Sequence, residues 1–101
     1  MKVNFNQPLL DPFGKKVTDE NNHPSTIGKL VATCLYNAKH IKGVPLTPEQ
    51  KFSAFNLSLK IANSKEEVDI TLEDAQLIKN LTAECFMAGV YGNIIKLIEN
   101  N

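Results

Sequence analysis

The stretch that decides the fold class runs from residue 47 to residue 63 and reads TPEQKFSAFNLSLKIAN. Thr47 is suited to cap a helix, Pro48 to fill its first position and Gln50 to complete a Thr-x-x-Gln capping box. Apolar residues then recur three and four residues apart, which is the spacing of one helix face. The stretch therefore predicts a helix over 48–63. Its predicted buried stripe comprises Phe52, Phe55, Leu59 and Ala62, widened by Leu57 and Ile61.

Three other segments show the same spacing. The first is predicted as a helix over 26–41, capped by Ser25 or Thr26 and ended by a left-handed Gly43. The others are predicted over 72–85, capped by Thr71, and over 88–99. The predicted core of the four helices contains Ile27, Leu30, Val31, Leu35, Phe52, Phe55, Leu59, Ile78, Leu81, Ile94 and Leu97.

The first 24 residues differ from the rest, because they hold three prolines and only scattered apolar residues. The run from Asp11 to Gly14, Asp-Pro-Phe-Gly, suits a type I turn and predicts a short hairpin at 9–17. Val68-Asp69-Ile70 predicts an extended strand beside that hairpin. We therefore expect a mainly α, small four-helix domain with a short N-terminal β-hairpin and minor α+β character. An arm at 1–24 and a helical body at 25–101 would form one domain.

Composition excludes several classes of protein. With 101 residues, 43% hydrophobic and 22% charged, the chain has the make-up of one globular domain. Neither a membrane span nor a signal peptide is predicted, so we expect a cytoplasmic location. All 11 basic residues are lysines and the net charge is zero, which argues against nucleic-acid binding. An AT-rich genome would also explain the absence of arginine.

Charge is nevertheless divided along the chain. Residues 1–46 carry six lysines against three acids, a net charge of +3, and residues 47–101 carry five lysines against eight acids, a net charge of −3. The acids Glu66, Glu67, Asp69, Glu73 and Asp74 lack the glycine and ligand spacing of a calcium loop. We interpret them as a solvated linker leading into a helix start.

The two cysteines and two histidines do not predict a catalytic site. Cys34 and Cys85 fall at stripe positions and are expected to be buried core thiols, with a bridge between the first and third helices as the alternative. His23 lies in a loop, and His40 in the expected last turn of the first helix. We therefore expect no enzymatic activity, no cofactor and no structural metal.

The N-terminal arm offers the candidate binding residues. Its apolar side chains either pack on the body or form an exposed patch for a partner. We predict a protein-binding role, favouring an acidic surface, for Phe5, Leu9, Leu10 and Phe13.

The chain resembles small uncharacterised proteins carried by tailed bacteriophages and prophages. The likeness rests on Leu-Leu-Asp-Pro-Phe-Gly (9–14), Thr-Ile-Gly-Lys-Leu-Val (26–31), Phe-Asn-Leu-Ser-Leu-Lys-Ile (55–61) and Val-Asp-Ile-Thr-Leu-Glu-Asp-Ala-Gln-Leu-Ile-Lys-Asn-Leu (68–81). Cys85-Phe86-Met87 departs from the more aliphatic, proline-containing joint of such proteins. The resemblance implies a small accessory role in a host cell.

Two functions fit these observations. One is a non-enzymatic phage or prophage accessory protein that binds a protein and modulates a host component. The alternative is a self-associating structural or assembly protein of the virion. Both use a protein partner, either a host protein or a second copy, and neither uses nucleic acid or a membrane.

Overall fold

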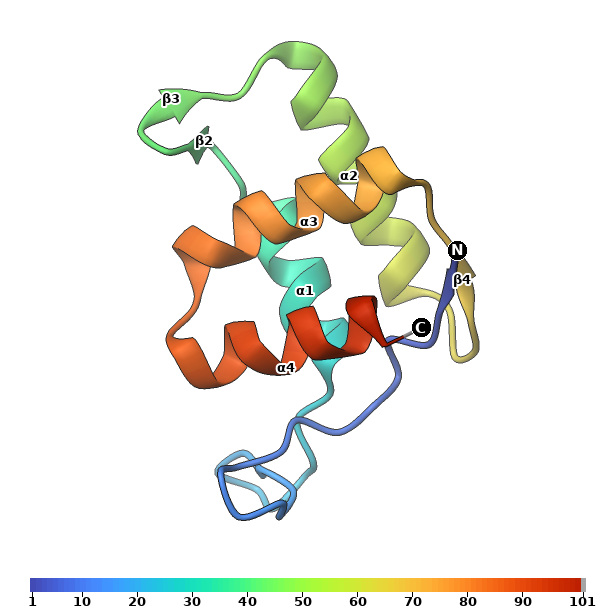
Figure 1. Cartoon of the computed structure of the whole chain (residues 1–101), viewed down its shortest axis with the longest axis vertical. Coiled ribbons are helices and arrows are strands. Elements are labelled where there is room, and N and C mark those ends of the chain that lie inside the picture. Colours follow the sequence, from blue (N-terminus) through green and yellow to red (C-terminus); the bar gives the residue numbers. More distant parts are fainter. Residues whose placement is uncertain (101) are drawn as a thin grey trace.

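The computed structural model describes residues 1–100 and contains four helices within them (Figure 1). The helices are α1 (Ile27–Tyr36), α2 (Pro48–Ala62), α3 (Leu72–Cys85) and α4 (Ala88–Glu99). Two-residue strands β1 (Lys2–Val3) and β4 (Val68–Asp69) form one small sheet, and β2 (His40–Ile41) and β3 (Val44–Pro45) form another. The mainly α, four-helix fold class with minor β character is therefore confirmed.

Helix α1 lies at the centre of the domain and contacts the three other helices (Figure 1). The hydroxyl of Thr26 caps it by accepting a hydrogen bond from the backbone N–H of Lys29 at 3.3 Å, as one of the two predicted caps. Ile27, Val31 and Leu35 are buried on its inner face, which confirms these core positions. Leu30 is only half-buried, so its assignment to the core was wrong.

The prediction that the first helix continues to residue 41 was wrong, because α1 ends at Tyr36. His40 and Ile41 instead pair with Val44 and Pro45 in an antiparallel hairpin. Lys42 (φ 51°) and Gly43 (φ 78°) are both left-handed, and two such central residues make the turn whose twist suits a tight hairpin. Gly43 therefore closes a hairpin turn and does not end a helix.

Helix α2 begins as predicted. Thr47 accepts a hydrogen bond from the backbone N–H of Gln50 at 3.1 Å, and the Gln50 side chain accepts one from the backbone N–H of Thr47 at 2.9 Å. This reciprocal pair satisfies two backbone donors that the helix start would otherwise leave free. Together with Pro48 in the first turn, it fixes where α2 starts.

Removal of this cap gives a first test of the fold. Thr47→Ala is expected to lower the free energy of unfolding by about 1 kcal/mol, which corresponds to a fall in Tm of about 4–8 °C for a domain of this size. Thermal unfolding followed by circular dichroism measures the shift. Ser53→Ala, at an exposed position inside the same helix, should not lower the Tm, because alanine favours helix there. An equal fall in both variants would show that the cap does not stabilise the helix.

The buried face of α2 agrees with the predicted stripe only at Leu57 and Ile61. Ala54, Leu57, Ser58 and Ile61 are buried against the rest of the domain, whereas Phe52, Phe55, Leu59 and Ala62 are exposed. The Ser58 hydroxyl donates to the Phe55 carbonyl at 2.6 Å, so its burial leaves no polar atom unpaired. The assignment of Phe52, Phe55 and Leu59 to the core was therefore wrong.

Helix α3 starts at a second capping box, formed by Thr71 and Asp74. Ile78 and Leu81 of α3 and Ile94 of α4 are buried as predicted, but Leu97 of α4 is only half-buried and its assignment to the core was wrong. Before α3, β4 pairs antiparallel with β1, with Val68 opposite Val3 (Figure 1). The predicted extended strand therefore exists, but it lies beside the first residues of the chain and not beside the 9–17 hairpin.

The first residues of the N-terminal arm pack on the helices, with Val3, Phe5 and Leu9 buried, whereas residues 10–24 project from the helical body (Figure 1). Leu10 pairs with Lys16 in the predicted hairpin, and two further bridges, Thr18 with Pro24 and Pro8 with Thr26, extend it into a small three-stretch meander. In the two turns the side chains of Asp11 and Asp19 each accept two backbone hydrogen bonds of 2.8–2.9 Å. The second turn was not predicted, although Asp19 repeats the role of Asp11 eight residues later.

Besides the pairing of β1 with β4, hydrogen bonds to α4 and α1 hold this arm against the body. The Asn93 side chain on α4 both accepts from and donates to the Leu10 backbone, at 3.3 and 3.1 Å. Gly28 donates its backbone N–H to the Phe5 carbonyl at 2.8 Å, and a Cβ atom at Gly28 would lie 3.1 Å from the same oxygen. The absence of a side chain at Gly28 thus lets the arm lie directly on α1.

Candidate functional site

The most prominent candidate site is an exposed aromatic surface on α2 and the end of α1. We define it by Tyr36, Phe52, Phe55 and Leu59, whose side chains are exposed by 62%, 65%, 40% and 41%. The ring centroids of Tyr36 and Phe55 lie 6.0 Å apart, and those of Phe52 and Phe55 lie 6.3 Å apart with nearly parallel planes. These aromatic pairs form one continuous apolar surface.

A shallow hollow of about 220 Å³ adjoins the aromatic surface between α1 and α2. Its walls include Ala32 and Thr33 of α1 and Ser58 and Ala62 of α2, and Tyr36 and Leu59 belong to both the hollow and the aromatic surface. The small side chains of the two helices leave this depression beside the large rings. The aromatic surface therefore borders an open depression lined by small side chains.

The helix geometry explains why the aromatic residues are exposed. Phe52, Phe55 and Leu59 recur at spacings of three and four, but so do Ala54, Leu57, Ser58 and Ile61. Both sets form a helix face, and only one of them can face the core. The sequence pattern favoured the face with the larger side chains. The signal that was missed is the second stripe, because a helix with two such faces can bury only one of them and leaves the other exposed.

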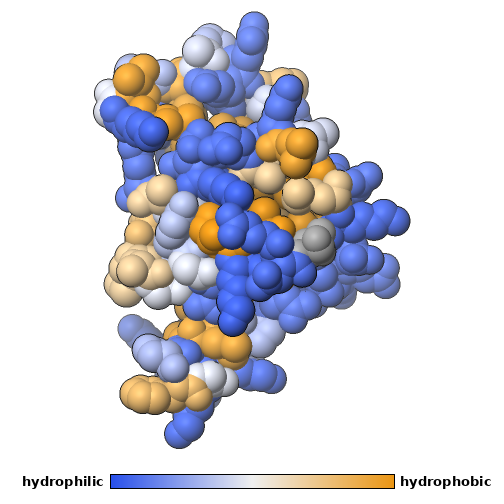
Figure 2. Space-filling model, viewed as in Figure 1, coloured by the Kyte–Doolittle hydropathy of each residue, from blue (hydrophilic) through white to orange (hydrophobic). Residues whose placement is uncertain are grey.

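The four predicted binding residues of the arm separate into two pairs. Phe5 and Leu9 are buried in the protein's own core, with Phe5 only 2% exposed. Leu10 is partly exposed and Phe13 is 86% exposed at the tip of the meander. Figure 2 shows hydrophobic side chains on this tip, at the bottom of the view, and at the β2–β3 hairpin at its upper left. Only Leu10 and Phe13 therefore remain available to a partner.

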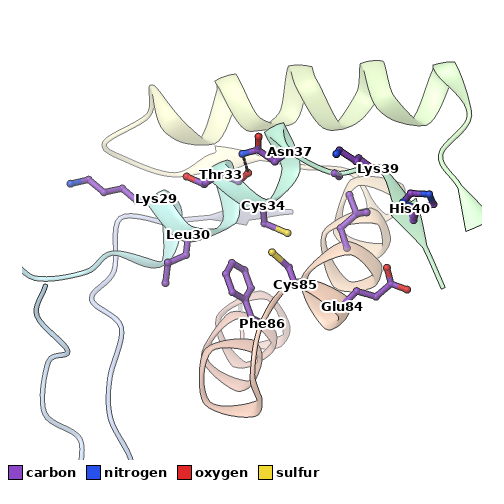
Figure 3. Close-up of a pocket in the computed structure, with 12 residues that line it drawn as sticks. Lys29, Leu30, Thr33, Cys34, Asn37, Lys39, His40, Glu84, Cys85 and Phe86 are labelled. Carbon is purple, nitrogen blue, oxygen red and sulfur yellow. Dashed lines mark hydrogen bonds between the residues drawn. The ribbon is translucent and has the colours of Figure 1, made fainter. Parts of the chain in front are cut away.

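The two thiols lie side by side next to a pocket (Figure 3). Cys34 on α1 is buried, as predicted, whereas Cys85 at the end of α3 is exposed, so the prediction that both are core thiols was wrong for Cys85. The pKa of Cys34 is raised from 9.0 to about 12, mainly because the thiol is buried. A hydrogen bond with Cys85 and the charge of Cys85 raise it further. At neutral pH Cys34 is therefore a neutral thiol.

The pocket beside the thiols has a volume of about 500 Å³ and apolar walls that include Leu30, Leu81 and Phe86. Lys29, Lys39 and His40 also line it, together with the single acid Glu84. The Glu84 carboxylate accepts a hydrogen bond from the backbone N–H of Lys42 in the β2–β3 turn. His40 thus belongs to a pocket wall and not to a helix terminus.

The acidic residues between α2 and α3 have local partners. Asp74 completes the capping box of α3, and Asp69 lies 3.3 Å from the amino group of Met1. Glu66, Glu67 and Glu73 are exposed. His23 is also exposed and lies 3.8 Å from Asp19. Within residues 1–100, His, Cys, Asp and Glu side chains nowhere gather in a group of three or more suited to a metal ion.

Comparisons with protein-family models, with curated proteins and with solved structures found no match to this chain. Among the described helices, none combines the length and the apolar character needed to cross a membrane.

Proposed function

We propose that this protein acts without catalysis by binding another protein through the aromatic surface of Tyr36, Phe52, Phe55 and Leu59. The observation that carries the proposal is the exposure of three neighbouring aromatic rings in a chain with only seven phenylalanine and tyrosine residues. Aromatic side chains are enriched at protein interfaces, where they supply most of the binding energy from few positions.

The extent of the aromatic surface is better explained by a protein-binding role than by the chance exposure of single residues. Single exposed apolar residues are common and need no explanation, but contiguous apolar patches mark interaction sites. The aromatic surface is contiguous, since Phe55 lies about 6 Å from both Tyr36 and Phe52. The adjoining hollow offers room for a side chain of the partner.

The resemblance to small phage and prophage proteins suggests the nature of this partner. We propose that the chain is a phage or prophage accessory factor that acts in the host cytoplasm and modulates a host protein. A gene position among early phage genes would agree with this role. A position among morphogenesis genes would argue against it.

Self-association is the second candidate, and one observation favours it. Glu49 lies in the first turn of α2 and Lys60 in the last, on either side of the apolar residues. Two copies of α2 packed antiparallel would place each Glu49 near Lys60 of the other copy and would oppose the two helix dipoles. The aromatic surface would then be a dimer interface of a structural or assembly protein.

Alanine at the two phenylalanines tests the proposal. The purified wild-type chain, immobilised and exposed to bacterial lysate, should retain a partner that mass spectrometry identifies. Phe52→Ala combined with Phe55→Ala should weaken this association by about 30-fold or more, because one buried aromatic anchor contributes about 2 kcal/mol or more at an interface and the contributions of neighbouring anchors do not simply add. Titration of the identified partner by calorimetry measures the change in Kd.

Leu72→Ala is the matched control, because Leu72 is also an exposed apolar residue but lies at the start of α3. It should leave the Kd unchanged. Analytical ultracentrifugation over a range of concentrations separates the two candidates. A dimer that the double variant abolishes would support self-association, and a partner bound equally well by the double variant would refute the aromatic surface.

A further inference from the structure

The cysteine pair carries an inference independent of the aromatic surface. Cys34 points from the buried face of α1 and Cys85 from the last residue of α3, and their sulfur atoms face each other (Figure 3). Both cysteines line the same pocket, and Cys85 is close enough to raise the pKa of Cys34. We propose that Cys34 and Cys85 are a redox-active pair that forms a reversible disulfide between α1 and α3, with Cys85 reacting first with a small disulfide such as oxidised glutathione.

The order of reaction follows from the different surroundings of the two thiols. A thiolate is the form that attacks a disulfide, and access decides which sulfur is reached. Cys85 is exposed, whereas Cys34 is buried and has its pKa raised to about 12. Cys85 is therefore the residue that meets the reagent, and Cys34 is the residue that resolves the product.

The adjoining pocket provides a place for the reagent. Its volume of about 500 Å³ is within the range of sites that hold small molecules, about 300–1,000 Å³. Cys34 and Cys85 both line it, and Lys29 and Lys39 stand in its walls. Glutathione carries carboxylates, and the two lysines of the lining outnumber its single acid, Glu84, so this pocket favours an anionic thiol compound over a neutral one.

The chemistry is a two-step thiol–disulfide exchange. In the first step the Cys85 thiolate attacks one sulfur of oxidised glutathione, the glutathione S–S bond breaks, and one glutathione thiolate leaves and takes up a proton. In the second step Cys34 loses its proton to solvent and attacks the Cys85 sulfur, and the second glutathione thiolate leaves and is protonated. Two protein thiols are oxidised, and one oxidised glutathione is reduced to two thiols.

The bridge would have a measurable effect on stability. It closes a loop from residue 34 to residue 85, which contains the β2–β3 hairpin, α2 and most of α3. Cross-linking a loop of this length restricts the unfolded chain, so the oxidised protein should have a Tm higher by about 10 °C or more. The second step should also accelerate as the pH rises, because only the thiolate of Cys34 attacks and burial disfavours that charged form.

The test equilibrates the full chain with graded ratios of reduced and oxidised glutathione and then measures intact mass and alkylation of free thiols. The expected oxidised product is a monomer lighter by two hydrogens that takes up no alkylating reagent. Cys34→Ala should stop at a single glutathione adduct on Cys85. Cys85→Ala, at an exposed position, should fold and remain unmodified.

Three results would overturn the proposal. They are a lasting glutathione adduct in the wild-type chain, a disulfide-linked dimer through Cys85, and two alkylated thiols after equilibration with oxidised glutathione. If Cys34→Ala does not fold, the wild-type chain and Cys85→Ala still decide the matter. A bridged monomer without a higher Tm would show that the bond does not join the helices in their native arrangement.

Discussion

Phe5→Ala is expected to lower the free energy of unfolding by about 3–5 kcal/mol, the largest effect of any single change in the N-terminal arm. Phe5 is 2% exposed and belongs to the same core cluster as Val3, Ile27 and Val31. Its replacement leaves a cavity in a domain whose total stability should be about 5–15 kcal/mol. Urea unfolding followed by circular dichroism measures the loss.

Phe13→Ala is the matched control, since the same side chain is removed from the same arm at a site that is 86% exposed. It should change the free energy of unfolding by no more than about 0.5 kcal/mol. If Phe5→Ala does not fold, Phe5→Leu keeps most of the buried volume and allows the comparison. Equal effects at the two positions would mean that the arm is not packed on the body.

The helices were predictable because their start signals are local. The capping boxes at Thr47 and Thr71 involve residues only three apart, and both are formed as hydrogen-bonded pairs. The turn at Asp11 is equally local, as its side chain bonds to backbone N–H groups two and four residues ahead. Signals of this range do not depend on the tertiary fold, so sequence alone reveals them.

The end of α1 was not predictable from the apolar stripe. Ala38 and Ile41 continue the helical spacing and both are half-buried, so they satisfy the stripe without being helical. α1 ends at Tyr36, and the hairpin turn follows at Lys42, which adopts a positive φ, a conformation that lysine rarely takes. A lysine at position 42 does not predict this turn, although Gly43, the next residue, is compatible with a hairpin turn.

The packing of the N-terminal arm could not be predicted from the local sequence. Val3 and Phe5 alternate with polar residues in the way of a short half-buried strand, but their partners are β4 and Gly28, far along the chain. Burial of Phe5 therefore depends on a long-range contact that spacing cannot reveal. The glycine at the start of α1 was the one clue, because it marks a close approach of two backbones.

The candidate site was missed for a related reason. A stripe of large apolar residues was taken as the core face of α2, although the actual core face uses small Ala54 and Ser58 beside Leu57 and Ile61. Small side chains allow α2 to lie close to α1, with which it has its most extensive contact. Close packing at one face leaves the larger rings on the outside, where they form the aromatic surface.

Leu57→Ala decides between these two faces of α2 and is expected to lower the free energy of unfolding by about 2–5 kcal/mol. Leu57 lies on the buried face of α2 and belongs to the core, so its replacement by alanine creates a cavity. Phe52→Ala, on the opposite face, should leave the stability unchanged or raise it by a few tenths of a kcal/mol, since alanine is the better helix former. Urea unfolding of both variants, monitored at the same protein concentration, measures the difference.

The comparison of Leu57→Ala with Phe52→Ala also bears on the proposed function. If Phe52→Ala proves the more destabilising change, the aromatic side chains are core residues and no aromatic surface exists to bind a partner. If Leu57→Ala proves the more destabilising, the loss of binding expected for Phe52→Ala combined with Phe55→Ala cannot be attributed to unfolding. Stability and association would then depend on two different faces of one helix, because Ala54, Leu57, Ser58 and Ile61 hold α2 in the domain while Phe52, Phe55 and Leu59 remain free to contact a partner.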